Sequence, residues 1–120
     1  MKKRILIIDD DPRNIFALAA TLRAKQFDVA SCTSASEALA KLKTDNAFDA
    51  VLIDMMMPEM DGYEAIPLIK EITPGRDLPI FAVTAQAMVG DREKCLASGA
   101  DHYVAKPIDV DRLLSLLESI

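Results

Sequence analysis

Four short apolar runs, each followed by a polar residue, constrain the fold of this 120-residue chain more than any other feature. The runs cover residues 5–8, 51–53, 81–83 and 103–105, and the polar residues that follow them are Asp9, Asp10, Asp54, Thr84 and Lys106. If each run is a parallel strand, its last residue lies at the carboxyl edge of the sheet, where open α/β folds bind their ligands. We therefore expect these five side chains to converge on one pocket.

Strand-like runs alternate with segments of helical periodicity along the chain. The predicted strands are residues 4–9, 28–32, 50–54, 79–83 and 102–104, and the predicted helices are residues 12–25, 35–44, 62–71, 87–98 and 110–119. Near-continuous apolar strands are buried on both faces, which is typical of a parallel sheet covered by helices on each side. The sequence therefore predicts a doubly wound α/β fold with five parallel strands and five helices, in one domain over residues 1–120.

Local residue choices support several of these boundaries. Pro12 suits the first turn of a helix, and Asp11 before it is placed to cap that helix. Ser34 begins a capping box, Asp109 is placed to cap the last helix, and Gly99 is placed for a left-handed turn after residues 87–98.

Composition narrows the function classes. With 51% hydrophobic and 28% charged residues the chain is ordinary for a globular domain, and its net charge of −5 argues against nucleic acid or an acidic membrane surface as a direct partner. Its apolar runs are far shorter than the roughly 18 residues of a membrane helix, and residues 5–8 are too few for a signal peptide. Cys32 and Cys95 lack metal-ligand spacing, so we expect free buried thiols and a reducing cytoplasm.

The five converging side chains indicate a particular chemistry. Three carboxylates attract a hard divalent cation, while the Thr84 hydroxyl and the Lys106 ammonium suit the oxygens of a phosphoryl group. Carboxylates 4 Å apart repel one another by about 4 kcal/mol per pair at an effective dielectric near 20, and a bound Mg²⁺ would offset that repulsion. The pattern predicts a magnesium and phosphoryl site in which an aspartate could itself take the phosphate.

At these residues the chain resembles the receiver domains of two-component response regulators. The intervals from Asp10 to Asp54, from Asp54 to Thr84 and from Asp54 to Lys106 are close to those of the family. Residues 54–62 resemble its phosphoacceptor loop, and residues 90–101 resemble its fourth helix and the following turn. The resemblance covers essentially the whole chain and implies the flavodoxin-like strand order 2-1-3-4-5, with its switch point between the first and third strands.

The resemblance also implies a ligand set. Mg²⁺ would be bound by Asp10, Asp54 and the backbone carbonyl of Met56, with Asp9 acting mainly through water. Asp54 would be the nucleophile that takes a phosphoryl group from a histidine kinase or a histidine phosphotransfer protein. The domain would then be a regulator, with at most self-phosphorylation and self-dephosphorylation, and Lys106 with Thr84 would neutralise charge on the transferred group.

Signalling residues follow from the same resemblance. Tyr103 is either a packed aromatic or the ring that turns inward when Thr84 engages phosphate, and Lys106-Pro107 carries either a cis or a trans peptide bond. The face made by the fourth helix, fifth strand and fifth helix would contact a downstream effector. Side chains two positions after the aspartate and the threonine, Met56 and Gln86, would tune the lifetime of the phosphoryl group.

The first predicted helix carries more apolar surface than one core-facing stripe needs, because residues 15–20 are apolar in succession. Either the helix is deeply buried or part of this surface faces outward. In receivers this helix docks the domain that carries the phosphodonor histidine, which makes Asn14, Ile15, Pro107 and Ile108 candidate docking residues. The family often has glycine at the position that Gln26 occupies in this chain. Either the helix ends differently from the family's or Gln26 takes a strained left-handed conformation.

Two other function classes compete with the receiver. A haloacid-dehalogenase-like phosphatase also uses a strand-end aspartate and Mg²⁺. Its nucleophile lies in an Asp-x-Asp-x-Thr arrangement, and residues 9–13 of this chain lack the threonine. A degenerate receiver that acts only as a binding module is disfavoured by the retained acids, threonine and lysine. The start at residues 1–4 favours a stand-alone regulator, whereas residues 84–95 resemble receivers attached to hybrid sensor kinases.

Overall fold

Five parallel strands form one sheet in the order β2-β1-β3-β4-β5, as the sequence predicts. The computed structural model describes residues 2–45, 47–73, 78–85 and 90–120. Its strands are β1 (Arg4–Ile8), β2 (Asp28–Cys32), β3 (Ala50–Asp54), β4 (Ile80–Thr84) and β5 (His102–Ala105). Its helices are α1 (Pro12–Ala24), α2 (Ala35–Thr44), α3 (Gly62–Ile72), α4 (Asp91–Ala97) and α5 (Val110–Glu118).

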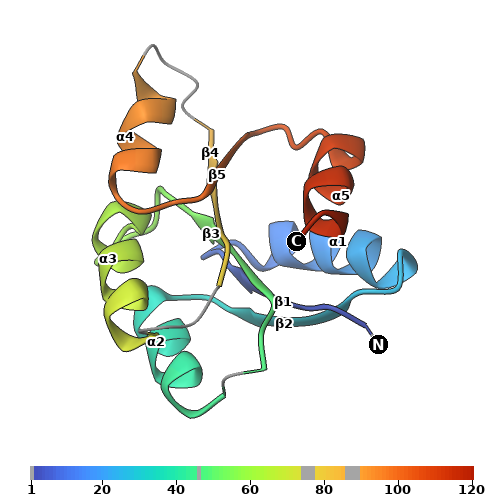
Figure 1. Ribbon diagram of the computed structural model, residues 1–120, viewed down its shortest axis with the longest axis horizontal. Helices are drawn as coiled ribbons and strands as arrows, with labels where there is room; N and C mark the ends of the chain where they lie inside the picture. The colour runs from blue at the N-terminus through green and yellow to red at the C-terminus, as the bar shows by residue number, and fades with distance from the viewer. Residues whose placement is uncertain (1, 46, 74–77, 86–89) are drawn as a thin grey trace.

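The helices cover both faces of the sheet, which lies between them in Figure 1. Helices α1 and α5 lie on one side, and α2, α3 and α4 lie on the other. Each strand contributes side chains to the apolar core on both faces of the sheet, because successive side chains of a strand point to opposite faces. In β1, for example, Ile5 and Ile7 pack toward α1 and α5, while Leu6 and Ile8 pack toward the other three helices.

Several strand and helix boundaries differ from the sequence prediction, most of them by one residue. Asp9 lies just beyond β1 rather than at its end, and β4 starts at Ile80 and includes Thr84. Helix α4 starts only at Asp91, because Gly90 has a φ of 88° and so cannot continue a right-handed helix. Residues 87–89 of the predicted helix lie outside the described residues.

The predicted caps are present. Asp11, Ser34 and Asp109 each accept a hydrogen bond from a backbone N–H in the first turn of the following helix. Gly99 has a φ of 116° and Gln26 has a φ of 73°, so the left-handed alternative for Gln26 is confirmed. Both residues turn the chain from a helix toward a strand.

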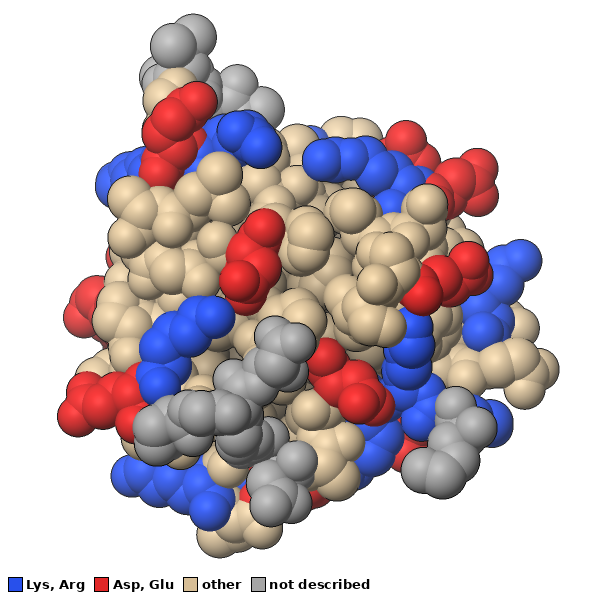
Figure 2. Space-filling view, in the orientation of Figure 1, with Lys and Arg blue, Asp and Glu red and all other residues tan. Residues whose placement is uncertain are grey.

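The exposure of α1 decides whether its apolar surface is deeply buried or partly faces outward. Phe16 is 77% exposed, so part of the apolar surface of this helix faces outward rather than into the core. Cys32 and Cys95 are free and buried, as predicted. Acidic and basic side chains are interspersed over the face drawn in Figure 2. Within the described ranges, every helix is too short or too polar to cross a membrane.

Candidate functional site

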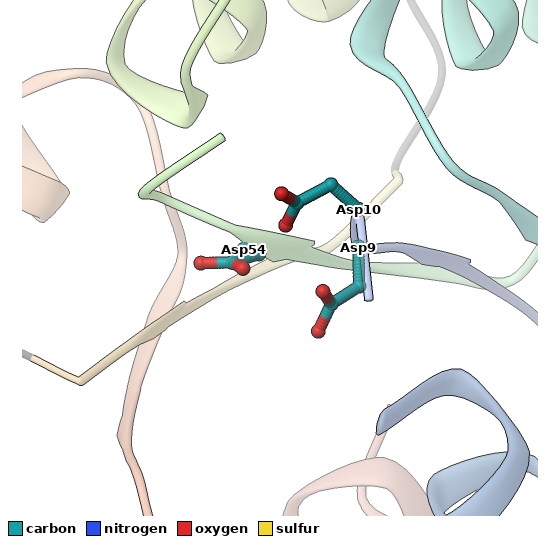
Figure 3. A group of neighbouring side chains, drawn as sticks. All are labelled: Asp9, Asp10 and Asp54. Atoms are coloured by element: carbon teal, nitrogen blue, oxygen red, sulfur yellow. The ribbon is translucent and has the colours of Figure 1, made fainter. Parts of the chain in front are cut away.

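Three carboxylates meet at the carboxyl edge of the sheet, where β1 and β3 are neighbours. Asp9 and Asp10 follow β1, and Asp54 is the last residue of β3. One carboxylate oxygen from each lies within 4.8 Å of the others, and Figure 3 shows the three side chains gathered beside the strand ends. We call Asp9, Asp10 and Asp54 the acidic cluster. The predicted convergence of these three residues is therefore present.

Backbone hydrogen bonds orient the two buried members of the acidic cluster. The N–H of Asp11 donates to Asp9 Oδ1 at 2.9 Å, and the N–H of Met56 donates to Asp54 Oδ1 at 3.0 Å. The Oδ2 atoms of the two residues face the same ammonium. Lys106 Nζ lies 3.6 Å from Asp9 Oδ2 and 3.5 Å from Asp54 Oδ2, which places the lysine between the ends of β1 and β3.

The charges of the site do not balance. Asp9 and Asp54 are both 7% exposed, and Asp10 is exposed. Burial raises the pKa of Asp54, whereas the N–H of Met56 and the ammonium of Lys106 act in the opposite direction. Asp9 adds to the rise through like-charge repulsion. One ammonium opposes three carboxylates, so a further cation would favour the ionised form of Asp54.

The donor set of the acidic cluster suits Mg²⁺. All three side chains offer carboxylate oxygens, the ligand type that this ion prefers, within the small space that one ion would span. The exposure of Asp10 leaves the cluster accessible to the water molecules that Mg²⁺ usually retains. The residues present therefore fit the ion that the sequence predicts.

Thr84 and Lys106 lie on the neighbouring strand ends. Thr84 closes β4 and is 1% exposed, and its carbonyl accepts a hydrogen bond from the Lys106 N–H at 2.8 Å. The Lys106-Pro107 peptide bond is cis, one of the two alternatives open from the sequence. Gln86 lies outside the described residues. Met56 is 50% exposed, next to buried Met55 and Met57.

An apolar cavity of about 560 Å³ continues from the acidic cluster into the space between α1 and α5. Asp9, Asp54 and Lys106 line its polar end. Three of the four predicted docking residues, Asn14, Pro107 and Ile108, also line it, together with Leu18. Ile15 does not line it, although like Ile108 it packs against the core cluster under α1. Its part in docking stays a prediction.

The side chain of Tyr103 is partly buried against the core on the α2–α4 side. Its hydroxyl donates to Asp91 Oδ2 at 3.2 Å, and the hydroxyl of Tyr63 donates to Asp91 Oδ1 at 2.9 Å. The sequence did not reveal Tyr63 and Asp91 as partners of Tyr103. They lie on α3 and α4, far apart along the chain, and their contact depends on how those helices pack.

Comparisons with known proteins agree on one family. The family model of the response regulator receiver domain matches residues 5–118. The chain is 40% identical to the signal transduction histidine-protein kinase BarA of Shigella flexneri, over 94% of this chain and 12% of BarA. It is also 40% identical to the transcriptional regulatory protein ZraR of Salmonella typhimurium, over 95% of this chain and 25% of ZraR. The chain therefore spans only a small part of these relatives.

A solved structure resembles the whole fold. It is the receiver domain of the sensor histidine kinase PA1611 from Pseudomonas aeruginosa PAO1, which is 34% identical with a TM-score of 0.88. The match covers 99% of this chain and 97% of that domain. The structure of that domain has a magnesium ion coordinated in its active site cleft.

Proposed function

Since this chain belongs to the response regulator receiver family, the phosphoacceptor switches of two-component signalling, we propose that Asp54 accepts its phosphoryl group. The family match also favours a regulator over the phosphatase that the sequence left as an alternative. The observation that carries the proposal is the position of Asp54, which is a member of the acidic cluster and faces Lys106 Nζ at 3.5 Å. No other side chain of the acidic cluster both ends a strand of the sheet and faces the lysine.

In the proposed transfer, a carboxylate oxygen of Asp54 attacks the phosphorus of a phosphohistidine. The new P–O bond forms as the P–N bond breaks, the electron pair stays on the imidazole nitrogen, and that nitrogen takes up a proton. Such transfer depends on positioning and on neutralising charge at the equatorial oxygens. Lys106 and the hydroxyl of Thr84 are the side chains of this chain that would bind those oxygens.

We propose that Mg²⁺ is held by Asp10, Asp54 and the backbone carbonyl of Met56, with Asp9 acting mainly through water. When bound, the ion supplies positive charge that offsets carboxylate repulsion and the charge of the phosphoryl oxygens. The protein contributes the rest: Lys106 orients Asp54, and the Met56 N–H fixes the oxygen that it contacts.

The proposed phosphodonor is a histidine kinase or a histidine phosphotransfer protein. The cavity between α1 and α5 is apolar and opens onto Asp54, so an apolar helical surface docked there would hold a phosphohistidine beside the carboxylate. Asn14, Ile15, Pro107 and Ile108 are the proposed docking residues. A net charge of −5 favours such a protein partner over nucleic acid for this domain.

We further propose that Tyr103 and Thr84 form the switch and that α4, β5 and α5 contact a downstream effector. A phosphoryl group adds about −1.5 to −2 charges, enough to attract the Thr84 hydroxyl and bias a two-state arrangement. Residues 1–120 would act as one receiver domain in the cytoplasm.

Incubation with Mg²⁺ and acetyl phosphate, followed by intact mass, tests the phosphoacceptor directly. We expect one added phosphoryl group on the wild type and on Asp111→Asn, a control that removes an exposed carboxylate on α5. Asp54→Asn, and the wild type without Mg²⁺, should gain none. Stoichiometric phosphorylation of Asp54→Asn would contradict the proposal.

A further inference from the structure

The only two tyrosines of the sequence, Tyr63 and Tyr103, both donate to one carboxylate. Tyr63 lies on α3, Tyr103 on β5, and Asp91 is the first residue of α4. The hydroxyls use different oxygens of Asp91, at 2.9 Å on Oδ1 and 3.2 Å on Oδ2. We call these three residues the tyrosine cluster. Three separate elements therefore meet at a single side chain.

Among the described residues, helix α4 buries few side chains in the core. Of its seven residues, all of them described, Cys95 alone is buried, whereas α3 buries four residues. Cys95 Sγ lies 3.7 Å from the Tyr63 hydroxyl, and Lys94 Nζ lies 4.4 Å from the centre of the Tyr63 ring. Tyr63 therefore contacts α4 through three of its residues, beside the packing of Cys95 in the core, and Asp91 links α4 to Tyr103.

We propose that Asp91 is a positioning residue, which fixes Tyr103 through its hydroxyl and ties the placement of that ring to the placement of α4. An inward turn of Tyr103 has to break the hydrogen bond from its hydroxyl to Asp91 Oδ2. Because hydrogen bonds to charged groups are stronger than those between neutral groups, this bond opposes the turn. Tyr63 keeps its own bond to Oδ1 during that motion. The role of Tyr103 as a switch rests on the proposed function, whereas the position of its hydroxyl does not.

Tyrosine absorbance reports on the tyrosine cluster alone, because the chain has no tryptophan and no tyrosine outside it. Burial raises the pKa of both phenols, and the negative charge of Asp91 raises both further. Cys95 contacts Tyr63 and raises the pKa of both phenols, and Lys94 lies over the Tyr63 ring. Replacing Asp91 by asparagine removes the charge and keeps one acceptor oxygen, so the ionisation of Tyr103 should move to lower pH.

The test uses the unphosphorylated full chain, with Asp91→Asn compared with Glu93→Gln. Glu93 supplies the matched control because it is an exposed acid in the same first turn of α4. In Asp91→Asn we expect the amides of residues 94–98 to exchange with deuterium about tenfold faster, as loss of a charge-assisted bond implies. We also expect tyrosine ionisation, followed by absorbance, to begin at lower pH. Glu93→Gln should change neither.

Tyr103→Phe keeps the ring and removes only the hydroxyl. It tests the same hydrogen bond independently, even if Asp91→Asn fails to fold. It should speed exchange in α4 by less than Asp91→Asn does, because the bond to Tyr63 remains. If Asp91→Asn matches Glu93→Gln in both measurements, or if Tyr103→Phe exchanges like the wild type, the proposal is wrong. No phosphodonor is present, so failure of phosphorylation at Asp54 would leave these outcomes unchanged.

Discussion

The acidic cluster and the tyrosine cluster both place aspartates at the ends of secondary structure elements, but they treat the charge differently. Asp9, Asp10 and Asp54 repel one another, with one ammonium beside them. Asp91 accepts from two hydroxyls that are neutral donors. The first set is incomplete without a cation, which suits a site that exchanges ligands. In the second set both carboxylate oxygens accept hydrogen bonds from side chains of the protein, which suits a contact that holds secondary structure elements in place.

The two clusters are joined by a short segment. Met55 follows Asp54, and Gly62 precedes Tyr63 at the start of α3. The N–H of Gly62 donates to the Met55 carbonyl at 3.3 Å. A side chain at Gly62 would contact the Met55 sulfur and its Cα, the latter at 2.9 Å. This close approach fixes where α3 begins relative to the phosphoacceptor strand.

Gly62→Ala should therefore have the largest effect on stability. Added volume in a packed interior typically costs 1 to 3 kcal/mol, and because the Met55 backbone is one of the obstacles we expect a loss of about 2 kcal/mol in the free energy of unfolding. Urea unfolding would measure it, with Glu64→Ala on the exposed side of the same helix turn as control. If Gly62→Ala is as stable as the wild type, the contact between Gly62 and Met55 does not fix the position of α3 relative to β3.

The next effect concerns the lifetime of phospho-Asp54. Met56 is half exposed two residues after Asp54, and its thioether cannot orient an attacking water as a polar side chain would. Met56→Asn and Met56→Glu should each speed loss of the phosphoryl group by about tenfold, the effect of roughly one hydrogen bond in the transition state. Intact mass followed over time measures the decay.

Met56→Leu is the matched control, because it keeps an apolar side chain of similar size. Its decay should equal that of the wild type. Equal decay in all four proteins would mean that Met56 contributes only its backbone carbonyl, and the receiver assignment would be unaffected.

The acidic cluster could be predicted from the sequence because strand ends in a parallel sheet share one edge. That rule needs only the apolar runs before Asp9 and Asp54, and it holds even where a boundary moves by one residue, as at Thr84. The strand order was not contained in the runs and came from the family resemblance.

The tyrosine cluster could not be predicted in the same way. Its contacts depend on the packing of α3 against α4, and nothing in the local sequence of Tyr63 or Asp91 records that packing. Pro67 gives a related example, because it lies inside α3 although it cannot donate to the helix. Buried neighbours, including Ile66 and Ile69, hold that helix in place despite the missing bond.

Melting of Asp10→Asn with and without Mg²⁺ tests most directly the claim that the acidic cluster is incomplete without a cation. Asp10 is exposed, so the amide stays solvated while one repelling charge is removed. In metal-free buffer we expect Asp10→Asn to melt roughly 2 to 5 °C above the wild type. Mg²⁺ should raise the melting temperature of the wild type and of Asp111→Asn more than that of Asp10→Asn. A lower melting temperature for Asp10→Asn in metal-free buffer would contradict the claim.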